Sequence, residues 1–301
     1  MRQCTHWPAF ALPLKLLWLG IGFFLLRHTR LRSFQPALHT TQGLQLVGTP
    51  RDSTLNAIVF YRGLFEPVLS HLIETLVEEG DVCVDAGANV GYFTLLLARQ
   101  VGRSGHVLSI EPVPRNLARL QANVSLNGFA DRVKVVQAAC GSTTGTVTFF
   151  VNRFNDMHCR LQLPTQYEWD HWLMGGSGAW HPISVPAVRL AEVLGGRAAE
   201  VSFVKLDIEG AEHLVIDDIL RHCTHPRLKV ALEAKAPFIR DTLHRFEAEG
   251  FWIYDLRNTY GWLFDQRALA PRLLSYAEVY QRRHMVDVLV CRQPLALTLS
   301  S

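Results

Sequence analysis

The chain has 301 residues, of which 49% are apolar and 19% charged, and its net charge is +3. This length suffices for one large domain or two small ones with a sizeable core. The weak positive charge, without a basic stripe interleaved with aromatic residues, argues against a nucleic-acid partner. The six cysteines are scattered along the chain, which is typical of buried free thiols and not of a disulfide framework or a zinc site.

The first 34 residues differ from the rest. Residues 9–26 form an apolar run of eighteen residues that only Lys15 interrupts, and several arginines follow it. As a helix this run would extend about 27 Å, close to the thickness of the hydrocarbon core of a bilayer. We therefore expect residues 1–34 to form a single-pass membrane anchor, with a cleaved secretory signal and a mitochondrial presequence as alternatives.

The side of the membrane on which the remainder lies stays open. The basic flank after the apolar run favours the cytosolic side. The run Asn123-Val124-Ser125 is a glycosylation sequon, which would require the secretory lumen, but it lies within a helical pattern.

After a linker expected over residues 35–54, residues 55–293 show the periodicity of one α/β domain, and residues 294–301 form a tail. Helical spacing of apolar residues from Pro67 to Val77 predicts the first helix. Strands are expected at 82–85, 106–110, 133–138, 202–207, 228–233, 251–255 and 286–290, helices at 91–99, 114–126, 211–221 and 238–248, and short extended runs at 146–151 and 184–188. Such alternation predicts a mostly parallel sheet covered by helices on both faces.

Residues 82–91 have the pattern of a strand, a glycine turn and the start of a helix. Gly87 and Gly91 would let a ligand approach the backbone, and the N-terminus of the helix presents free N–H groups. Asn89 stands where a dinucleotide fingerprint needs its second glycine, so that kind of site is excluded. Asp85, directly before the turn, would repel a phosphate and suits the ammonium group of S-adenosylmethionine.

A second acid, Glu111, follows the expected strand at 106–110. An acid at the tip of this strand accepts hydrogen bonds from ribose hydroxyls. Capping of the helix that opens at Pro114 is the alternative role. The adenine ring is expected at the end of the third strand, near Ala139, within residues 137–142.

The third motif is the run Val-Lys-Leu-Asp-Ile-Glu-Gly-Ala-Glu at 204–212. On an extended strand Lys205, Asp207 and Glu209 share one face, because side chains alternate. We expect Asp207 or Glu209 to act as the base or to orient it. Lys205 would fix the carboxylate, with Asp207 as its first expected partner and Glu233 as the second. A purely structural ion pair is the alternative.

Three further residues are expected on the acceptor side. Glu212 lies in the first turn of the next helix, and Glu233 ends the adjacent expected strand. His158 belongs to the segment 152–184, whose aromatic residues and glycines suit a lid or a sugar-binding surface, with a plain surface loop as the alternative. Asp207 and Glu233 offer a divalent ion two oxygen ligands without a third, so no metal site is predicted.

These motifs resemble the FkbM-type methyltransferases, a family of class I S-adenosylmethionine-dependent O-methyltransferases. The matching pieces are residues 84–91, 110–112 and 205–212, together with the lead-in 61–67 and the run 231–233. The resemblance extends over about residues 55 to 290. Two departures are His213, where an apolar residue is expected, and the segment 152–184, which matches nothing in the family.

The resemblance implies a Rossmann-like class I methyltransferase fold with an antiparallel last strand, and S-adenosylmethionine as the cofactor. It also implies methyl transfer to a hydroxyl of a carbohydrate or small-molecule acceptor. A methyltransferase acting on a membrane lipid or a protein carboxylate is one alternative. A non-catalytic, methyltransferase-like binding module is another, against which the acids at 85, 111, 207 and 209 argue. The sequence predicts no oligomeric state.

Overall fold

The structure, a computed structural model, describes residues 38–48, 59, 63–152, 159–160, 180–256, 271–282 and 285–295. The expected anchor at 1–34 and His158 lie outside these described residues. Within the part that the structure describes, no helix combines the length and the apolar character that a membrane crossing needs.

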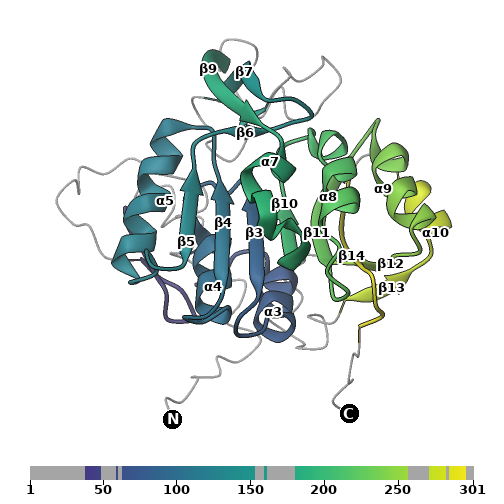
Figure 1. The fold of residues 1–301 in the computed structure, drawn as a ribbon, viewed down its shortest axis with the longest axis horizontal. Helices are drawn as coiled ribbons and strands as arrows, with labels where there is room; N and C mark the ends of the chain where they lie inside the picture. The colour runs from purple at the N-terminus through teal and green to yellow at the C-terminus, as the bar shows by residue number, and fades with distance from the viewer. Residues whose placement is uncertain are drawn as a thin grey trace, which may run out of the picture.

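An eight-stranded sheet forms the centre of the molecule (Figure 1). Its order is β13-β12-β14-β11-β10-β3-β4-β5. The bounds are β3 Val82–Ala86, β4 His106–Ile110, β5 Val133–Val136, β10 Val201–Leu206, β11 Lys229–Lys235, β12 Trp252–Asp255, β13 Arg272–Leu274 and β14 Met285–Cys291. Strands β11, β10, β3, β4 and β5 are parallel, whereas β14 is antiparallel to both β11 and β12. The mostly parallel sheet with an antiparallel last strand is confirmed.

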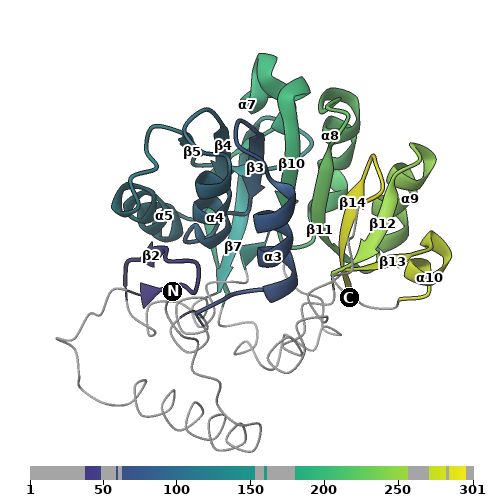
Figure 2. The same ribbon diagram turned by 90° about the horizontal axis from the view of Figure 1, so that it is seen from below.

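Helices cover both faces of the sheet (Figure 2). Helices α3 Pro67–Leu76, α4 Tyr92–Gln100 and α5 Pro114–Leu126 lie on one face, and α7 Leu190–Leu194, α8 Ile216–His222, α9 Ile239–Ala248 and α10 Tyr276–Tyr280 lie on the other. Because side chains alternate along a strand, each face has its own apolar core. Val84 packs in the core beneath α8 and α9, and Cys83 in the core beneath α3 and α4. Cys83, Cys140 and Cys291 are buried free thiols, as expected.

A second sheet, which the sequence analysis does not predict, lies above the carboxyl ends of the central strands (Figure 1). Its strands are β6 Ala139–Cys140, β7 Gly145–Asn152, β8 Cys159–Arg160 and β9 Trp180–Val188, in the order β6-β9-β7-β8. The two short runs expected here are the antiparallel pair β7 and β9. This sheet reaches over the edge at which open α/β sheets bind their ligands.

The helix expected at 211–221 is divided. A 3-10 turn, η4 Glu212–Leu214, comes first, and α8 follows after Val215. Gly210, just before this turn, has a φ of +94°, so the chain makes a sharp bend there. The bend replaces the first turn of the expected helix.

The linker prediction is wrong for residues 38–48, which form a hairpin of β1 Leu38–His39 and β2 Gln45–Leu46. The hairpin is attached to α5 by two backbone donors. The N–H of Gln45 donates to Asn127 Oδ1 at 2.9 Å, and the N–H of Val47 donates to Asn123 Oδ1 at 2.6 Å. Its leucines join the core beneath α3 and α4. The glycines and prolines around this stretch favour a linker, so the sequence does not indicate that these leucines are buried.

The sequon residue Asn123 is fully buried. Besides accepting from the hairpin, its Nδ2 donates to the carbonyl oxygen of Val90 at 2.7 Å. Asn123 therefore joins the hairpin, α5 and the turn before α4. In the folded chain this side chain is inaccessible, so the absence of a glycan on Asn123 would not identify the compartment.

Candidate functional site

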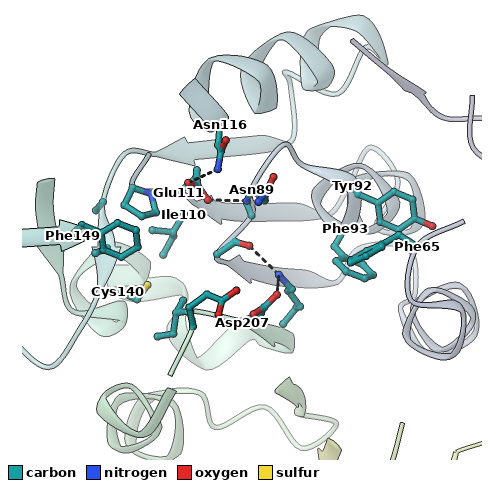
Figure 3. Close-up of a pocket in the computed structure, with 18 residues that line it drawn as sticks. Phe65, Asn89, Tyr92, Phe93, Ile110, Glu111, Asn116, Cys140, Phe149 and Asp207 are labelled. Atoms are coloured by element: carbon teal, nitrogen blue, oxygen red, sulfur yellow. Dashed lines mark hydrogen bonds and ion pairs between the residues drawn. The ribbon is translucent and has the colours of Figure 1, made fainter. Parts of the chain in front are cut away.

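A pocket lies at the carboxyl ends of β3, β4 and β10 (Figure 3). Its empty volume is about 810 Å³, including space open to solvent, which is ample for a nucleoside-sized ligand. We call it the first pocket. Of the predicted site residues, its lining includes Gly87, Asn89, Glu111, Ala139, Lys205, Asp207 and Glu209.

The two glycines of the turn are required by packing within the chain. Gly87 has a φ of +77°, and a Cβ there would lie 1.8 Å from the carbonyl oxygen of Asp207. Gly91 has a φ of +94°, and a Cβ there would lie 2.5 Å from Leu120 Cδ1. Gly91 is not part of the lining of the first pocket. The turn thus packs against the loop after β10 on one side and against α5 on the other.

Glu111 lies at the tip of β4 and is 4% exposed. Its Oε2 accepts from the N–H of Asn89 at 2.8 Å, and its Oε1 accepts from the N–H of Val113, the residue that caps α5, at 3.0 Å. Burial raises the pKa of Glu111 to about 7, against these hydrogen bonds. Glu111 thus holds the chain just before α5, but α5 has no side-chain cap hydrogen bond, so the capping alternative is not supported. Glu111 also faces the first pocket, where its remaining lone pairs suit ribose hydroxyls; the ribose contact stays a prediction.

Asp85 lies beneath the turn and is fully buried. Its Oδ2 accepts from the hydroxyl of Thr94 at 2.6 Å, and its Oδ1 lies 3.5 Å from Lys205 Nζ. The first pocket does not include it. The predicted direct contact with the cofactor is thus not supported, because the strand turns this side chain toward α4 and the buried lysine.

Lys205 joins the turn to the loop after β10. Its Nζ lies 3.3 Å from Asp207 Oδ2 and donates to the carbonyl oxygen of Gly87 at 3.0 Å. Burial lowers the pKa of Lys205, but Asp207 and then Asp85 raise it by more, so it stays charged. The predicted pairing of Lys205 with Asp207 is confirmed.

The chain leaves the extended conformation before Glu209. Strand β10 ends at Leu206, and Glu209 has a left-handed φ of +57°, so the predicted continuation of one strand face to Glu209 is wrong. Glu209 Oε2 lies 2.7 Å from Lys235 Nζ. Glu233, expected as a second partner of Lys205, instead lies 2.6 Å from Lys235. The Asp207 and Glu209 carboxylates therefore pair with different lysines.

A second pocket adjoins the first and shares Lys205, Asp207 and Glu209 with it. Its empty volume is about 680 Å³. Its other charged residues are Glu66, Glu233, Lys235 and Asp287. Burial, and next the nearby Asp207, raise the pKa of Glu66 to about 8. The second pocket therefore gathers charged side chains beside an apolar part formed by leucines and Ala231, and Asp207 lies where the two pockets meet.

Glu212 supports the loop after β10 through hydrogen bonds to its backbone. It is 2% exposed and lines neither of the two pockets. Its Oε1 accepts from the N–H of Ile208 at 3.0 Å and from the N–H of Gly210 at 3.1 Å. The predicted acceptor contact of Glu212 is thus not supported by its position. Among the described residues, no group of three or more His, Cys, Asp or Glu side chains is placed to hold a metal ion.

An apolar wall completes the first pocket; the sequence analysis expects the adenine at its Ala139 and Cys140 but misses Phe149. Phe149 of β7 lies beside Ile110 and Cys140 on the Glu111 side of the pocket (Figure 3). Ala139 lies in the same wall. An apolar slot next to a buried acid fits an adenine ring joined to a ribose. No local pattern marks Phe149, because only the pairing of β7 with β9 brings it here.

Comparisons with known proteins indicate the family of this chain. The family model described as the methyltransferase FkbM domain matches residues 85–257. "Methyltransferase 1" of Beauveria bassiana (strain ARSEF 2860) is 28% identical over 146 residues, 46% of this chain and 56% of that protein. "Methyltransferase sdnD" of Sordaria araneosa is 38% identical over 71 residues, 23% of this chain and 27% of that protein. The chain thus spans about half or less of the length of these relatives.

Among solved structures, a SAM-dependent O-methyltransferase of Thermotoga maritima is similar with a TM-score of 0.40 and 14% identity, over 85% of this chain and 77% of that chain. The family model covers more than half of the 301 residues and all three motifs of the site, apart from residues 82–84 at the start of the first motif. The chain therefore belongs to the FkbM family of S-adenosylmethionine-dependent methyltransferases.

Proposed function

We propose that this protein transfers a methyl group from S-adenosylmethionine to a hydroxyl oxygen of a carbohydrate or small-molecule acceptor. The observation that carries the proposal is the junction of the two pockets at Asp207. The first pocket has an apolar slot and a buried acid that suit an adenosine. The second pocket opens beside it, and its charged side chains can accept and donate hydrogen bonds to a hydroxyl-bearing acceptor.

The cofactor supplies the methyl group, and its sulfur is the leaving group. The acceptor oxygen forms a bond to the methyl carbon as the carbon–sulfur bond breaks, and the bonding electron pair stays on sulfur. The hydroxyl proton passes to a base. Asp207 suits this role because it borders both pockets and its side chain is 35% exposed. From Asp207 the proton can pass to solvent.

Lys205 serves Asp207 in two ways. Its ammonium group lies 3.3 Å from the carboxylate and holds it in place. Its hydrogen bond to Gly87 ties that carboxylate to the turn of the first pocket. Alignment of the acceptor oxygen with the methyl group is a large part of what a methyltransferase contributes. The link from Lys205 to Gly87 helps to hold that alignment.

The test uses the full chain and S-adenosylmethionine with a labelled methyl group. An extract is separated into lipid, glycan, protein and small-molecule fractions, and each is incubated with the chain. We expect base-stable label in the glycan or small-molecule fraction. Label in lipid, or base-labile label in protein, would favour the alternative acceptors. Calorimetry with S-adenosylhomocysteine completes the test, since binding without transfer indicates a non-catalytic module and absence of binding overturns the proposal.

We also propose that residues 9–26 hold the protein on a membrane, because their length and apolar character match a bilayer core. Alkaline carbonate extraction of membranes from expressing cells tests this. The full chain should stay in the pellet, and a chain without residues 1–34 should be released. Release of both would contradict the anchor, and N-terminal sequencing of the mature protein would reveal a cleaved signal or presequence.

A further inference from the structure

A second lysine–carboxylate cluster lies beside the pair that the proposed reaction uses. It consists of Glu209, Lys235 and Glu233, and we call it the Lys235 cluster. Lys235 ends β11, and Glu233 lies two residues earlier, so both side chains leave the strand on the same side. Lys235 Nζ lies 2.7 Å from Glu209 Oε2 and 2.6 Å from Glu233 Oε2. The ammonium group thus bridges the loop after β10 and the end of β11.

The cluster is largely shielded from water. The side chains of Glu209, Glu233 and Lys235 are 13%, 20% and 19% exposed. Ion pairs in such a place are screened far less than pairs on the surface. Two carboxylates on one site without a cation would not both ionise, and one would keep its proton. The ionisation of the Glu209–Glu233 pair therefore depends on Lys235.

The position of Glu209 depends on Lys235 as well. Glu209 has a left-handed backbone, with a φ of +57°, which is uncommon for a residue other than glycine. Its side chain reaches Lys235 from there and lines both pockets. Glu212 holds the backbone on either side of it through the N–H groups of Ile208 and Gly210. Backbone and side chain of Glu209 are thus held by separate contacts.

Other charged groups face the same space. They are Lys205 of β10, Asp207 of the following loop, Glu212 of η4, Glu66 before α3 and Asp287 of β14. Acids outnumber lysines among them, so the loss of one ammonium group has a large effect on the carboxylates that remain. Burial also raises the pKa of Glu233 well above its usual range, and Lys235 opposes that rise.

We infer that Lys235 is a positioning residue of the methyl-transfer site, which keeps Glu209 ionised and directed at the junction of the two pockets, where Glu209 accepts a hydrogen bond from the acceptor. The inference rests on the proposed function and deepens it. Asp207 takes the proton and is served by Lys205, while Glu209 orients the acceptor and is served by Lys235. Each carboxylate has its own cation.

The first test needs no acceptor. The full chain is labelled with ¹³C in the glutamate side-chain carboxyl groups and titrated by NMR, and Glu209→Gln and Glu233→Gln assign the two resonances. In Lys235→Met we expect the midpoint of the Glu209 titration to rise by about 1–3 pH units, because a neighbouring cation is lost. Lys235→Arg should keep the midpoint near that of the parent. Lys229→Met, on the same face at the other end of β11, is the matched control and should leave it unchanged.

The second test measures turnover with the fraction that accepts label. Lys235→Met should lose at least about tenfold in rate at neutral pH and regain part of it at higher pH, as Glu209 ionises. Lys235→Arg should restore most of the rate. Binding of S-adenosylhomocysteine should stay the same in every variant, since Lys235 does not line the first pocket.

An unchanged Glu209 titration in Lys235→Met would overturn the inference and leave the proposed function standing. So would an unchanged rate. If the parent chain neither binds S-adenosylhomocysteine nor transfers label, the proposed function fails instead. If Lys235→Met folds poorly, Lys235→Arg still tests the inference, because it keeps the positive charge and should keep both the Glu209 titration and most of the rate.

Discussion

The two pockets that meet at Asp207 are built in different ways. In the first pocket, backbone N–H groups fix Glu111, the acid that the second pocket does not share, and Phe149 and its neighbours supply apolar walls. In the second pocket, ion pairs between side chains fix the acids, with Lys235 at the centre. The first arrangement suits recognition of a ligand by shape. The second sets the charge around the groups that we propose for catalysis, so substitutions there should affect turnover and its pH dependence more than cofactor binding.

The largest expected effect is that of Asp207→Asn. The amide keeps the shape but cannot take a proton, so the rate of methyl transfer should fall by a factor of about 10² to 10⁴. Lys205 keeps Asp85 and the Gly87 carbonyl as partners, so the affinity for S-adenosylhomocysteine should change little. Initial rates and calorimetry measure the two quantities. Asp217→Asn, at an exposed carboxylate of α8, is the control, and a variant at Asp207 with near-parental rate would remove it as the base.

A second prediction concerns the close contact between the glycine turn after β3 and the loop after β10. Gly87→Ala should destabilise the chain by more than about 3 kcal/mol, because a Cβ would lie 1.8 Å from the Asp207 carbonyl oxygen in a left-handed backbone. Gly210→Ala shares the positive φ but has no atom within 4 Å of the added Cβ, and should cost about 1–2 kcal/mol. Urea unfolding measures both. Equal losses would show that backbone strain alone, and not the close approach, explains the glycine.

A third prediction follows from Glu212, whose pKa burial raises from 4.5 to about 7. The folded chain binds this proton more tightly than the unfolded chain, so the stability from this group is full below about pH 4.5 and is lost as the pH rises toward 7. Glu212→Gln keeps an oxygen for both loop N–H groups. Relative to the parent, it should therefore gain stability between pH 5 and pH 8, by about 3 kcal/mol at most.

Urea unfolding at several pH values tests this prediction. The difference in unfolding free energy between Glu212→Gln and the parent should grow with pH. A difference that is constant with pH would mean that Glu212 does not titrate in this range. Turnover by the same variant also tests whether Glu212 contacts the acceptor, since a purely supporting residue should tolerate the amide.

Much of the first pocket is predictable from the sequence because its signals are local. The strand, the glycine turn and the helix lie within residues 82–100, and the bounds of α5 follow from Pro114 and the apolar spacing after it. Glu111 is predicted by its place at a strand tip. The role of Asp85 is not predictable in this way, since the burial that pairs it with Lys205 depends on a strand more than a hundred residues away.

The second pocket is less predictable for the same reason. The alternation of side chains that places Lys205 and Asp207 together is a local pattern. The prediction made from it holds up to the end of the strand. Glu209 departs from it because hydrogen bonds from the loop to Glu212 bend the chain after Leu206. The partner of Glu209 is Lys235 of β11. No pattern near residues 205–212 predicts this pairing. Ion pairs between neighbouring strand ends become visible only once the sheet order is known.

The smallest expected effect tests the apolar wall, which comes from the second sheet. Phe149→Ala should weaken binding of S-adenosylhomocysteine about tenfold, the loss of roughly 1.4 kcal/mol of aromatic contact. Val151→Ala is the matched control, because Val151 lies two residues further on the same face of β7 and in the same small core, but does not line the first pocket. Calorimetry should show near-parental affinity for it. If both variants lose affinity equally, the second sheet acts through its packing alone, and recognition by shape would rest on Ile110, Ala139 and Cys140 without a contribution from the phenylalanine ring.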